Sequence, residues 1–313
     1  MPNTLGHLGA QQLLTRAAFR AVDLRWVYVG CVLPDAPWIL NRALRGLGLH
    51  GDPYALRLYC VAQASLFVLL FLCAALALVS PVPKKTFLVL ALNAVLHLLL
   101  DAAQARLGNG VQLLAPFHWT DLGFGWFWPE AWPSTALTVL GLVLVLYVLV
   151  RRPGFPVGLD LRRAGRVRLA GALLAAWFTL PFLLTGAVEA ADCHFVGTLR
   201  DAASRPGRTV EVDRGLYLPR PAGDVYRFWS EEEFAVVGLS LPGPAKVSVR
   251  AVFLDPHTLS VEEAHVHHGS RREWASYVGL GLIALLCLLS TRRPRAAGPG
   301  TPAPPPTGAG PCA

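Results

Sequence analysis

The sequence predicts an α-helical integral membrane protein with about five transmembrane helices and one small extracytoplasmic β domain. Only 15% of its 313 residues are charged, whereas soluble globular proteins carry about 25%. The missing charge leaves several long apolar blocks, which is how transmembrane helices appear in a sequence. Between the last two blocks, apolar and polar residues alternate and Gly and Pro interrupt them, a pattern typical of β-strands and turns.

Five blocks approach the roughly 20 residues that a helix needs to cross a hydrocarbon core. They occupy residues 61–79, 87–105, 136–150, 169–188 and 277–290. A weaker candidate covers residues 24–40, where Asp35 and two prolines interrupt the apolar run. Before it, residues 6–19 have the pattern of an amphipathic helix.

Basic residues cluster in three of the segments that join or follow the blocks. They are Lys84 and Lys85, then Arg151, Arg152, Arg162, Arg163, Arg166 and Arg168, then Arg292, Arg293 and Arg295. Alternation of the blocks places all three segments on one side, which the positive-inside rule identifies as the cytoplasm. We therefore expect a multi-pass protein of the plasma (inner) membrane with a cytoplasmic C-terminus. Topology also explains the net charge of +8 better than a nucleic-acid partner does.

These features divide the chain into five parts. Residues 1–135 form a helical membrane domain, and residues 136–189 add two transmembrane helices joined by a basic cytoplasmic loop. Residues 190–274 form the extracytoplasmic β domain, and residues 275–292 the last transmembrane helix. The tail 293–313 is rich in Pro and Gly and is expected to be disordered. The lipid bilayer is the expected partner of the helical parts.

The β domain is expected to be a compact antiparallel barrel or sandwich, similar to an OB fold. Strand patterning covers residues 209–218, 234–241, 246–254 and 259–267, and about five strands fit into the segment. Its core should form from alternating apolar residues: Val210, Val212, Val236, Val247, Val249, Phe253, Val261 and Val266. The domain shows no catalytic constellation, so its expected role is to bind a protein or a saccharide.

The second apolar block contains two ionisable residues, His97 and Asp101. They lie one helical turn apart and therefore project from the same face of the helix. Such a pair is costly in an apolar helix unless it is partnered, so it marks a functional site by default. An imidazole nitrogen and a carboxylate oxygen can bind one divalent metal ion. The alternative is that the two side chains hydrogen-bond each other and only fix helix packing.

Four short motifs follow one another in the first part of the chain. They are Gly6-His7-Leu8, Leu33-Pro34-Asp35, His97-Leu98-Leu99-Leu100-Asp101 and Leu113-Leu114-Ala115-Pro116-Phe117. Over about residues 1–133 the chain thereby resembles the YdjM-like family of predicted membrane-bound metal-dependent hydrolases, which are distantly related to zinc phospholipase C. The resemblance implies a divalent metal cofactor, expected to be zinc, with His7, Asp35, His97 and Asp101 as ligands.

The sequence also departs from the family pattern. Pro37 stands where the family has a second Asp, and residues 59–65 contain no histidine where the family has a His-rich stretch. The ligands that remain suffice for one ion. If that ion binds, it would activate water, and Asp35 or Asp101 would take the proton as the catalytic base. The expected substrate is a lipid or lipid-linked phosphoester reached from the bilayer edge. The alternative is a catalytically degenerate membrane scaffold that presents its β domain to a partner.

Two further groups of residues are weaker candidates. His118 and Asp121 follow the fourth motif and could approach Asp101, although a loop beside the neighbouring tryptophans is the simpler interpretation. His265 and His267 share one face of a strand, with His257 and His268 near them in the sequence. A second metal site there is conceivable, and a solvated strand end is the simpler interpretation.

Overall fold

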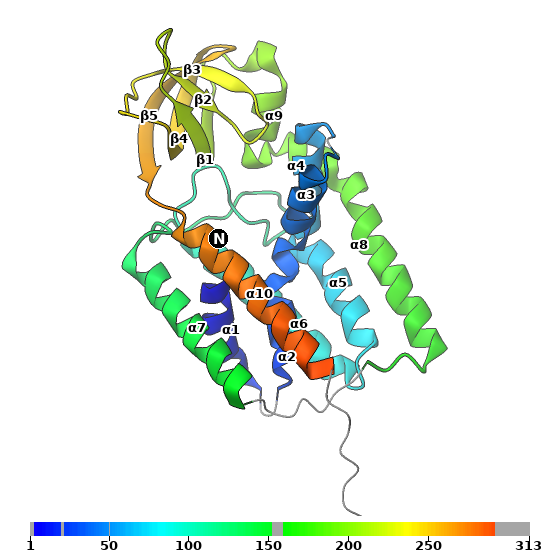
Figure 1. Ribbon diagram of the computed structural model, residues 1–313. Coiled ribbons are helices and arrows are strands. Elements are labelled where there is room, and N and C mark those ends of the chain that lie inside the picture. The colour runs from blue at the N-terminus through cyan, green and yellow to red at the C-terminus, as the bar shows by residue number, and fades with distance from the viewer. Residues whose placement is uncertain (1–2, 20–21, 50, 152–158, 292–313) are drawn as a thin grey trace, which may run out of the picture.

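The computed structural model describes residues 3–19, 22–49, 51–151 and 159–291. It consists of a bundle of helices that carries a small β-barrel at one end (Figure 1). The predicted disordered tail, residues 293–313, lies outside the described residues. The C-terminal ends of α7 and α10 lie at the end of the bundle far from the barrel. This is the relative arrangement that alternation of the apolar blocks predicts.

Four described helices are long and apolar enough to cross a membrane. They are α6 (Pro83–Ala103), α7 (Trp132–Arg151), α8 (Ala164–Ala190) and α10 (Arg271–Thr291). Helices α7, α8 and α10 contain the predicted blocks 136–150, 169–188 and 277–290, and α6 covers the block 87–105 up to Ala103, so these four helices are confirmed. Large apolar side chains remain exposed on α7, α8 and α10, among them Val143, Leu183 and Leu288. An exposed apolar helix surface is what lipid contact requires.

The block at residues 61–79 forms a broken element instead of one straight helix. It is divided between α4 (Pro53–Ala64) and α5 (Leu66–Leu78), which meet at an angle of 64°. At the break, Ser65 is extended and its hydroxyl donates a hydrogen bond to the Ala62 carbonyl at 2.7 Å. The Leu66 amide donates to the carbonyl of Gln112, which lies in another segment. The broken backbone is thus supplied with partners, which makes such a break tolerable inside a membrane.

The first part of the chain folds as α1 (Thr4–Ala18), α2 (Leu24–Val32), a 3-10 turn (Leu33–Asp35) and α3 (Ala36–Gly46). The helix predicted at residues 6–19 is confirmed. The candidate span at residues 24–40 is not one helix, because the Pro34-containing turn separates α2 from α3. Helix α1 runs away from the barrel end of the bundle and α2 runs back (Figure 1). The start of α1 therefore lies near the end of α6.

Helix α1 packs closely on α7 through two glycines. A Cβ atom on Gly9 would lie 2.7 Å from the Gly141 nitrogen, and a Cβ on Gly141 would overlap the Leu5 carbonyl oxygen. Small residues let two helix backbones approach to this distance, which is a common device in membrane helix pairs. This contact fixes the position of α1, which carries His7.

The barrel contains β1 (Thr209–Leu218), β2 (Val225–Arg227), β3 (Glu233–Val237), β4 (Ala245–Asp255) and β5 (Thr258–His267). Its strands close in the order β1-β2-β3-β5-β4. The prediction of a purely antiparallel domain is wrong, because β3 pairs with β5 in parallel. A closed ring with an odd number of strands cannot alternate direction at every pair, so closure of five strands forces a parallel pair. The short strand β2 was not among the predicted strand ranges.

The predicted barrel core is confirmed. Five of its residues are buried: Val210, Val212, Val247, Val249 and Phe253. The other three, Val236, Val261 and Val266, are partly buried against that core. Aromatic side chains fill the remainder, including the fully buried Tyr217, Tyr226 and Phe234.

The glycine contact between α1 and α7 leads to a first prediction. Gly141→Leu places a side chain where the α1 backbone lies, so it should lower the thermal midpoint of the purified protein by several degrees or prevent folding. Gly171→Leu on α8 is the matched control, because nothing lies within 4 Å of a Cβ there. Equal midpoints for the two variants, measured by fluorescence-monitored melting in detergent, would contradict the assigned α1–α7 contact.

Candidate metal centre

Three separate elements bring the four predicted site residues together. His7 comes from α1, Asp35 from the 3-10 turn, and His97 and Asp101 from the barrel-side half of α6. All four are buried: both histidines are 0% exposed, Asp101 is 5% exposed and Asp35 is 8% exposed. The two imidazole rings stack in parallel with their centroids 3.8 Å apart. Sequence positions almost a hundred residues apart thus form one compact cluster.

The nitrogen and oxygen atoms of this cluster face one another. His7 Nε2 lies 3.3 Å from Asp101 Oδ1, and His97 Nε2 lies 3.7 Å from Asp101 Oδ2. His97 Nε2 also lies 3.5 Å from Asp35 Oδ1. The donor atoms of His7, His97 and Asp101 all lie within 4.8 Å of one another, a spacing that can hold a metal ion.

A plain hydrogen-bond network does not account for these contacts. The distances between His97 and the two carboxylates exceed those of ordinary hydrogen bonds. Within the described part of the chain, His7 Nε2, His97 Nε2 and Asp35 Oδ1 are buried and form no hydrogen bond of ordinary geometry, only contacts with one another or with Asp101 at 3.3–3.7 Å. Each such atom costs about 1–3 kcal/mol. The alternative in which His97 and Asp101 only hydrogen-bond each other is therefore disfavoured.

The spacing fits a single central cation. Ligand atoms about 2.0–2.1 Å from a tetrahedral zinc ion lie roughly 3.3 Å from one another. The separations of 3.3 and 3.7 Å that join His7 and His97 to Asp101 are close to that value, whereas Asp35 Oδ1 lies 3.5 Å from His97 Nε2 and is not among the three donor atoms that all lie within 4.8 Å of one another. Two imidazole nitrogens and two carboxylates form a donor set that suits Zn²⁺ and related divalent ions. The residues present therefore fit the metal that the sequence resemblance implies.

The second ring nitrogen of each histidine is also held. His97 Nδ1 donates to the Cys31 carbonyl at 2.7 Å, which leaves Nε2 as the lone-pair atom that faces the cluster. His7 Nδ1 lies 3.1 Å from the Gln11 side-chain amide, whose oxygen has no partner in the described structure. Turning that amide by half a turn lets its oxygen accept from His7 Nδ1–H. Both histidines then present Nε2 for metal binding.

Arg106 is a member of the site that the sequence did not reveal. Its Nη1 lies 3.1 Å from Asp101 Oδ2, so the guanidinium helps to hold that carboxylate charged and oriented. The Asp101 carboxylate raises the pKa of Arg106, although burial of the guanidinium acts against it. Arg106 is an isolated arginine after an apolar block, and isolated arginines carry no sequence signal of a site.

Asp35 and Asp101 also line a cavity of about 300 Å³ at the junction of bundle and barrel. The bundle contributes Trp38 and Arg57 to its walls, and β1 contributes Asp213 and Arg214. Two chemically different parts of the chain thus enclose the space next to the histidine–aspartate cluster.

Asp121, a weaker candidate, holds a different histidine. It accepts a hydrogen bond from the His194 amide at 2.8 Å, and its Oδ1 lies 3.7 Å from His194 Nε2. His194 Nε2 also lies 3.1 Å from the Gly110 carbonyl. Burial lowers the pKa of His194 to about 4. His118, the other weaker candidate, is exposed.

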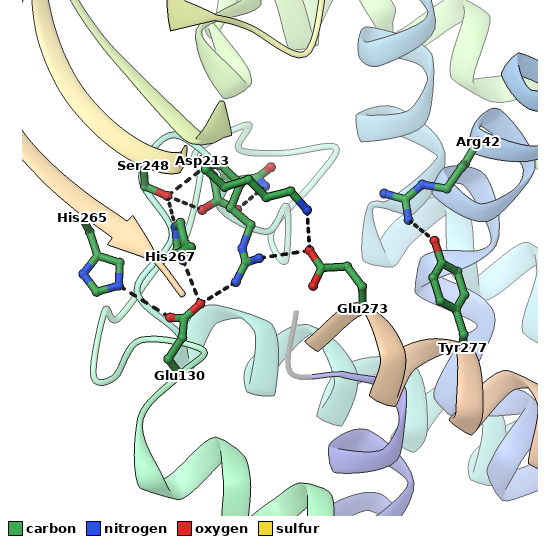
Figure 2. A network of polar contacts seen from close by, with 11 residues as sticks. Arg42, Glu130, Asp213, Ser248, His265, His267, Glu273 and Tyr277 are labelled. Atoms are coloured by element: carbon green, nitrogen blue, oxygen red, sulfur yellow. Dashed lines mark hydrogen bonds and ion pairs between the residues drawn. The ribbon is translucent and has the colours of Figure 1, made fainter. Parts of the chain in front are cut away.

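A second polar network joins the barrel to the bundle. Figure 2 shows Glu130, which precedes α7, between His265 and His267 of β5. His267 Nδ1 lies 2.8 Å from Glu130 Oε1 and His265 Nε2 lies 3.5 Å from Glu130 Oε2. Glu130 Oε1 also contacts Arg214 Nη2 at 2.6 Å. His267 Nε2 lies 2.7 Å from Ser248 Oγ.

These contacts explain the strand-end histidines without a metal ion. The donor atoms of Glu130, His265 and His267 are close enough for one. A guanidinium already neutralises Glu130, and both ring nitrogens of His267 have partners. The network therefore docks the barrel on the bundle. The sequence suggested a solvated strand end. Instead, Glu130 bridges His265 and His267, while His257 and His268 are exposed.

A comparison of the chain with protein-family models, curated proteins and solved structures found no match.

The depressed pKa of His194 gives a pH-dependent prediction. The folded protein holds this imidazole neutral down to about pH 4, whereas an ordinary histidine protonates near 6.5. The unfolded state therefore binds more protons below pH 6.5, and stability falls as the pH drops from there toward 4. The thermal midpoint of His194→Gln should fall less between pH 7.5 and 5 than that of the wild type, while the exposed-site control His118→Gln should follow the wild type. A wild-type slope in His194→Gln would contradict the assignment.

Proposed function

We propose that this protein is a membrane-embedded metal-dependent hydrolase of the YdjM-like type, with one divalent ion held by His7, Asp35, His97 and Asp101. The observation that carries the proposal is the convergence of these buried ligand atoms beside a cavity, at spacings that suit one zinc ion. A buried cluster of this kind inside a helix bundle is costly without a cation.

A bound divalent ion supplies Lewis-acid chemistry: it activates water for hydrolysis and stabilises negative charge on a phosphoryl or carbonyl oxygen. The chain's own residues supply position and proton transfer. Arg106 and the two histidines contact Asp101, which assigns that carboxylate to binding. Asp35 lines the cavity and contacts His97 through Oδ1, so we assign Oδ1 to the ion and the other carboxylate oxygen of Asp35 to accepting a proton.

The departures from the family pattern favour a mononuclear centre. Pro37, at the position of the missing Asp, is buried, and its carbonyl accepts from the Cys60 thiol. In the histidine-free stretch, Gln63 is buried and donates to the Trp177 carbonyl. These positions are used for packing between α3, α4 and α8 and offer no further ligands.

The barrel supports the OB-like assignment. It is a small closed barrel of five strands, and OB folds are five-stranded Greek-key barrels that bind oligosaccharides or other polymers on one face. We infer a binding or docking role for it, with a saccharide or a protein as partner. If the centre proves to hold no metal, the second candidate function is a membrane scaffold that presents this barrel, which Pro37 and the histidine-free residues 59–65 favour.

Metal analysis of the purified protein tests the hydrolase. Wild type should contain about one equivalent of zinc or manganese, and His97→Ala and Asp101→Ala should lose it, because each removes a ligand from a site with four. His118→Ala, an exposed histidine near the same end of the bundle, should keep the metal. A metal-free wild type, or stoichiometric metal in both ligand variants, would exclude the centre.

Labelling of introduced cysteines tests the orientation. The barrel is proposed to lie outside and the Arg162-containing loop in the cytoplasm, following the positive-inside rule. Arg220→Cys in the barrel should react with a membrane-impermeant maleimide on intact cells, while Arg162→Cys should react only after permeabilisation. The native Cys31, Cys60, Cys73 and Cys193 are buried and should give a low background, and Cys287 and Cys312 are replaced by Ser in both variants and in the control. The reverse pattern would overturn the orientation.

A further inference from the structure

The cavity beside the metal centre is lined by an excess of arginine. Its five arginines outnumber its three carboxylates. The arginines are Arg42, Arg57, Arg106, Arg214 and Arg272. They come from α3, α4, the segment after α6, β1 and α10, so no single element accounts for their convergence. A cluster of this kind in a partly enclosed space attracts anions, and guanidinium groups match phosphate oxygens in pairs.

Several of these side chains are incompletely hydrogen-bonded or not paired with a carboxylate. Within the described structure, the Nε atoms of Arg57, Arg106 and Arg214 are buried and have no hydrogen-bond partner. Neither Arg42 nor Arg57 forms an ion pair with a carboxylate of the described residues: Arg42 contacts the Tyr277 hydroxyl at 3.4 Å (Figure 2), and Arg57 contacts the Asn109 side chain at 3.3 Å. A buried donor without an acceptor is costly unless a ligand or water supplies one.

Arg57 is also held rigidly. Its guanidinium lies 4.3 Å from the Trp229 ring centroid and 5.5 Å from that of Trp38. Stacking of this kind fixes the plane of the guanidinium and its donors. An anion that reaches the cavity therefore meets a prepositioned donor, which reduces the entropy lost on binding.

The β1 bulge brings Arg214 to the same place. The register of β1 against β4 shifts between Val212 and Gly215, and Arg214 adopts a left-handed φ of 58°. Bulges redirect side chains in this way, often next to functional sites. Arg214 bridges Glu130 and Glu273 and lines the cavity.

A second cavity continues the first toward an apolar surface. It has a volume of about 440 Å³ and shares five residues with the arginine-lined cavity: Asp35, Trp38, Arg42, Arg214 and Arg272. Lys246 and Glu273 add further charges to its walls, and its apolar edge is formed by Ile39 of α3 and by Tyr277 and Leu280 of α10. Ile39 is 39% exposed and Tyr277 is 53% exposed, so this cavity reaches the outer surface of the helices. Helix α10 is one of the helices that could cross a membrane, which places lipid beside this opening.

We propose that the two cavities form one binding site for an amphiphile with a phosphate head group, the phosphoryl group lying among the arginines beside Asp35 and Asp101 and the hydrocarbon chain leaving between α3 and α10. Both spaces are lined by more basic than acidic side chains, and the second one also has an apolar edge, formed by Ile39 and Leu280, at the outer surface of the helices. This inference deepens the proposed hydrolase by naming its substrate class and rests on that proposal only for the chemistry. Binding itself needs no metal.

Binding of dodecyl phosphate to the purified full-length protein tests the site, with dodecanol and inorganic phosphate as the other two probes. Dodecyl phosphate should bind at least tenfold more tightly than either, because only it engages both cavities. Arg42→Gln and Arg57→Lys should each weaken it about tenfold. Arg45→Gln is the matched control, since Arg45 lies one turn from Arg42 on α3, lines neither cavity and contacts the Trp229 carbonyl. Arg42 is the main probe because its change leaves the buried core intact.

A bulky side chain at the apolar edge of the second cavity tests binding of the hydrocarbon chain separately from binding of the head group. Leu280→Trp should weaken the binding of dodecyl phosphate and leave the binding of inorganic phosphate unchanged. Leu285→Trp on the same helix should change the affinity for neither. Equal affinity for dodecanol and dodecyl phosphate, or unchanged affinity in both arginine variants, would overturn the site. If inorganic phosphate binds as tightly as dodecyl phosphate, the hydrocarbon chain adds no affinity, and the assignment to a lipid-like ligand would be overturned. Metal content measured on the same samples keeps the proposals apart: a metal-free protein that binds dodecyl phosphate contradicts the hydrolase alone.

Discussion

The burial of Asp101 inside a helix bundle is the constraint on which the rest of this structure depends. A carboxylate in an apolar span is costly unless charges of opposite sign or a cation surround it. Here α1 supplies His7, α6 supplies His97 and the segment after α6 supplies Arg106, all within 4 Å of the Asp101 oxygens. The position of α1 follows from this need as much as from apolar packing, and the Gly9–Gly141 contact allows the helix to come close enough.

The barrel closes the polar end of the bundle. Glu130 and Glu273 flank the starts of α7 and α10, and Arg214 of β1 contacts both. A single bulged residue therefore connects the barrel to two helices, while Asp213 and Arg214 complete the cavity wall above Asp35 and Asp101. The cavity is consequently a property of the whole chain. Neither the helices nor the barrel would enclose it alone.

The same arrangement relates the membrane to the chemistry. The apolar edge of the second cavity lies between α3 and α10, and Arg42, Arg214 and Arg272 line both cavities. An amphiphile in the bilayer would present its head group to the arginines and the histidine–aspartate cluster without leaving the lipid phase entirely. The broken span α4–α5 contributes here as well, because Arg57 reaches the cavity from the segment that bends away at Ser65. Breaks of this kind are tolerated in membranes where the freed backbone lines a cavity or contacts other protein.

The sequence by itself determined the parts that depend on local pattern. Apolar length identified α6, α7, α8 and α10, alternation identified β1, β4 and β5, and the His97–Asp101 spacing placed two charged groups on one helix face. The short motifs also predicted that His7 and Asp35 belong beside that pair, and both residues lie there.

The tertiary structure decided what depends on distant contacts. At the break next to Ser65, the Leu66 amide donates a hydrogen bond to the Gln112 carbonyl, and no local sequence pattern predicts this break. The parallel pairing of β3 with β5 follows from closing five strands into a ring, which alternation within one strand cannot reveal. Arg57 and Arg106 read as isolated charges in the sequence, because a cationic cavity exists only once five separate elements meet. Local periodicity fixes which face of an element is polar, whereas the partner of that face is set by the packing of the whole chain.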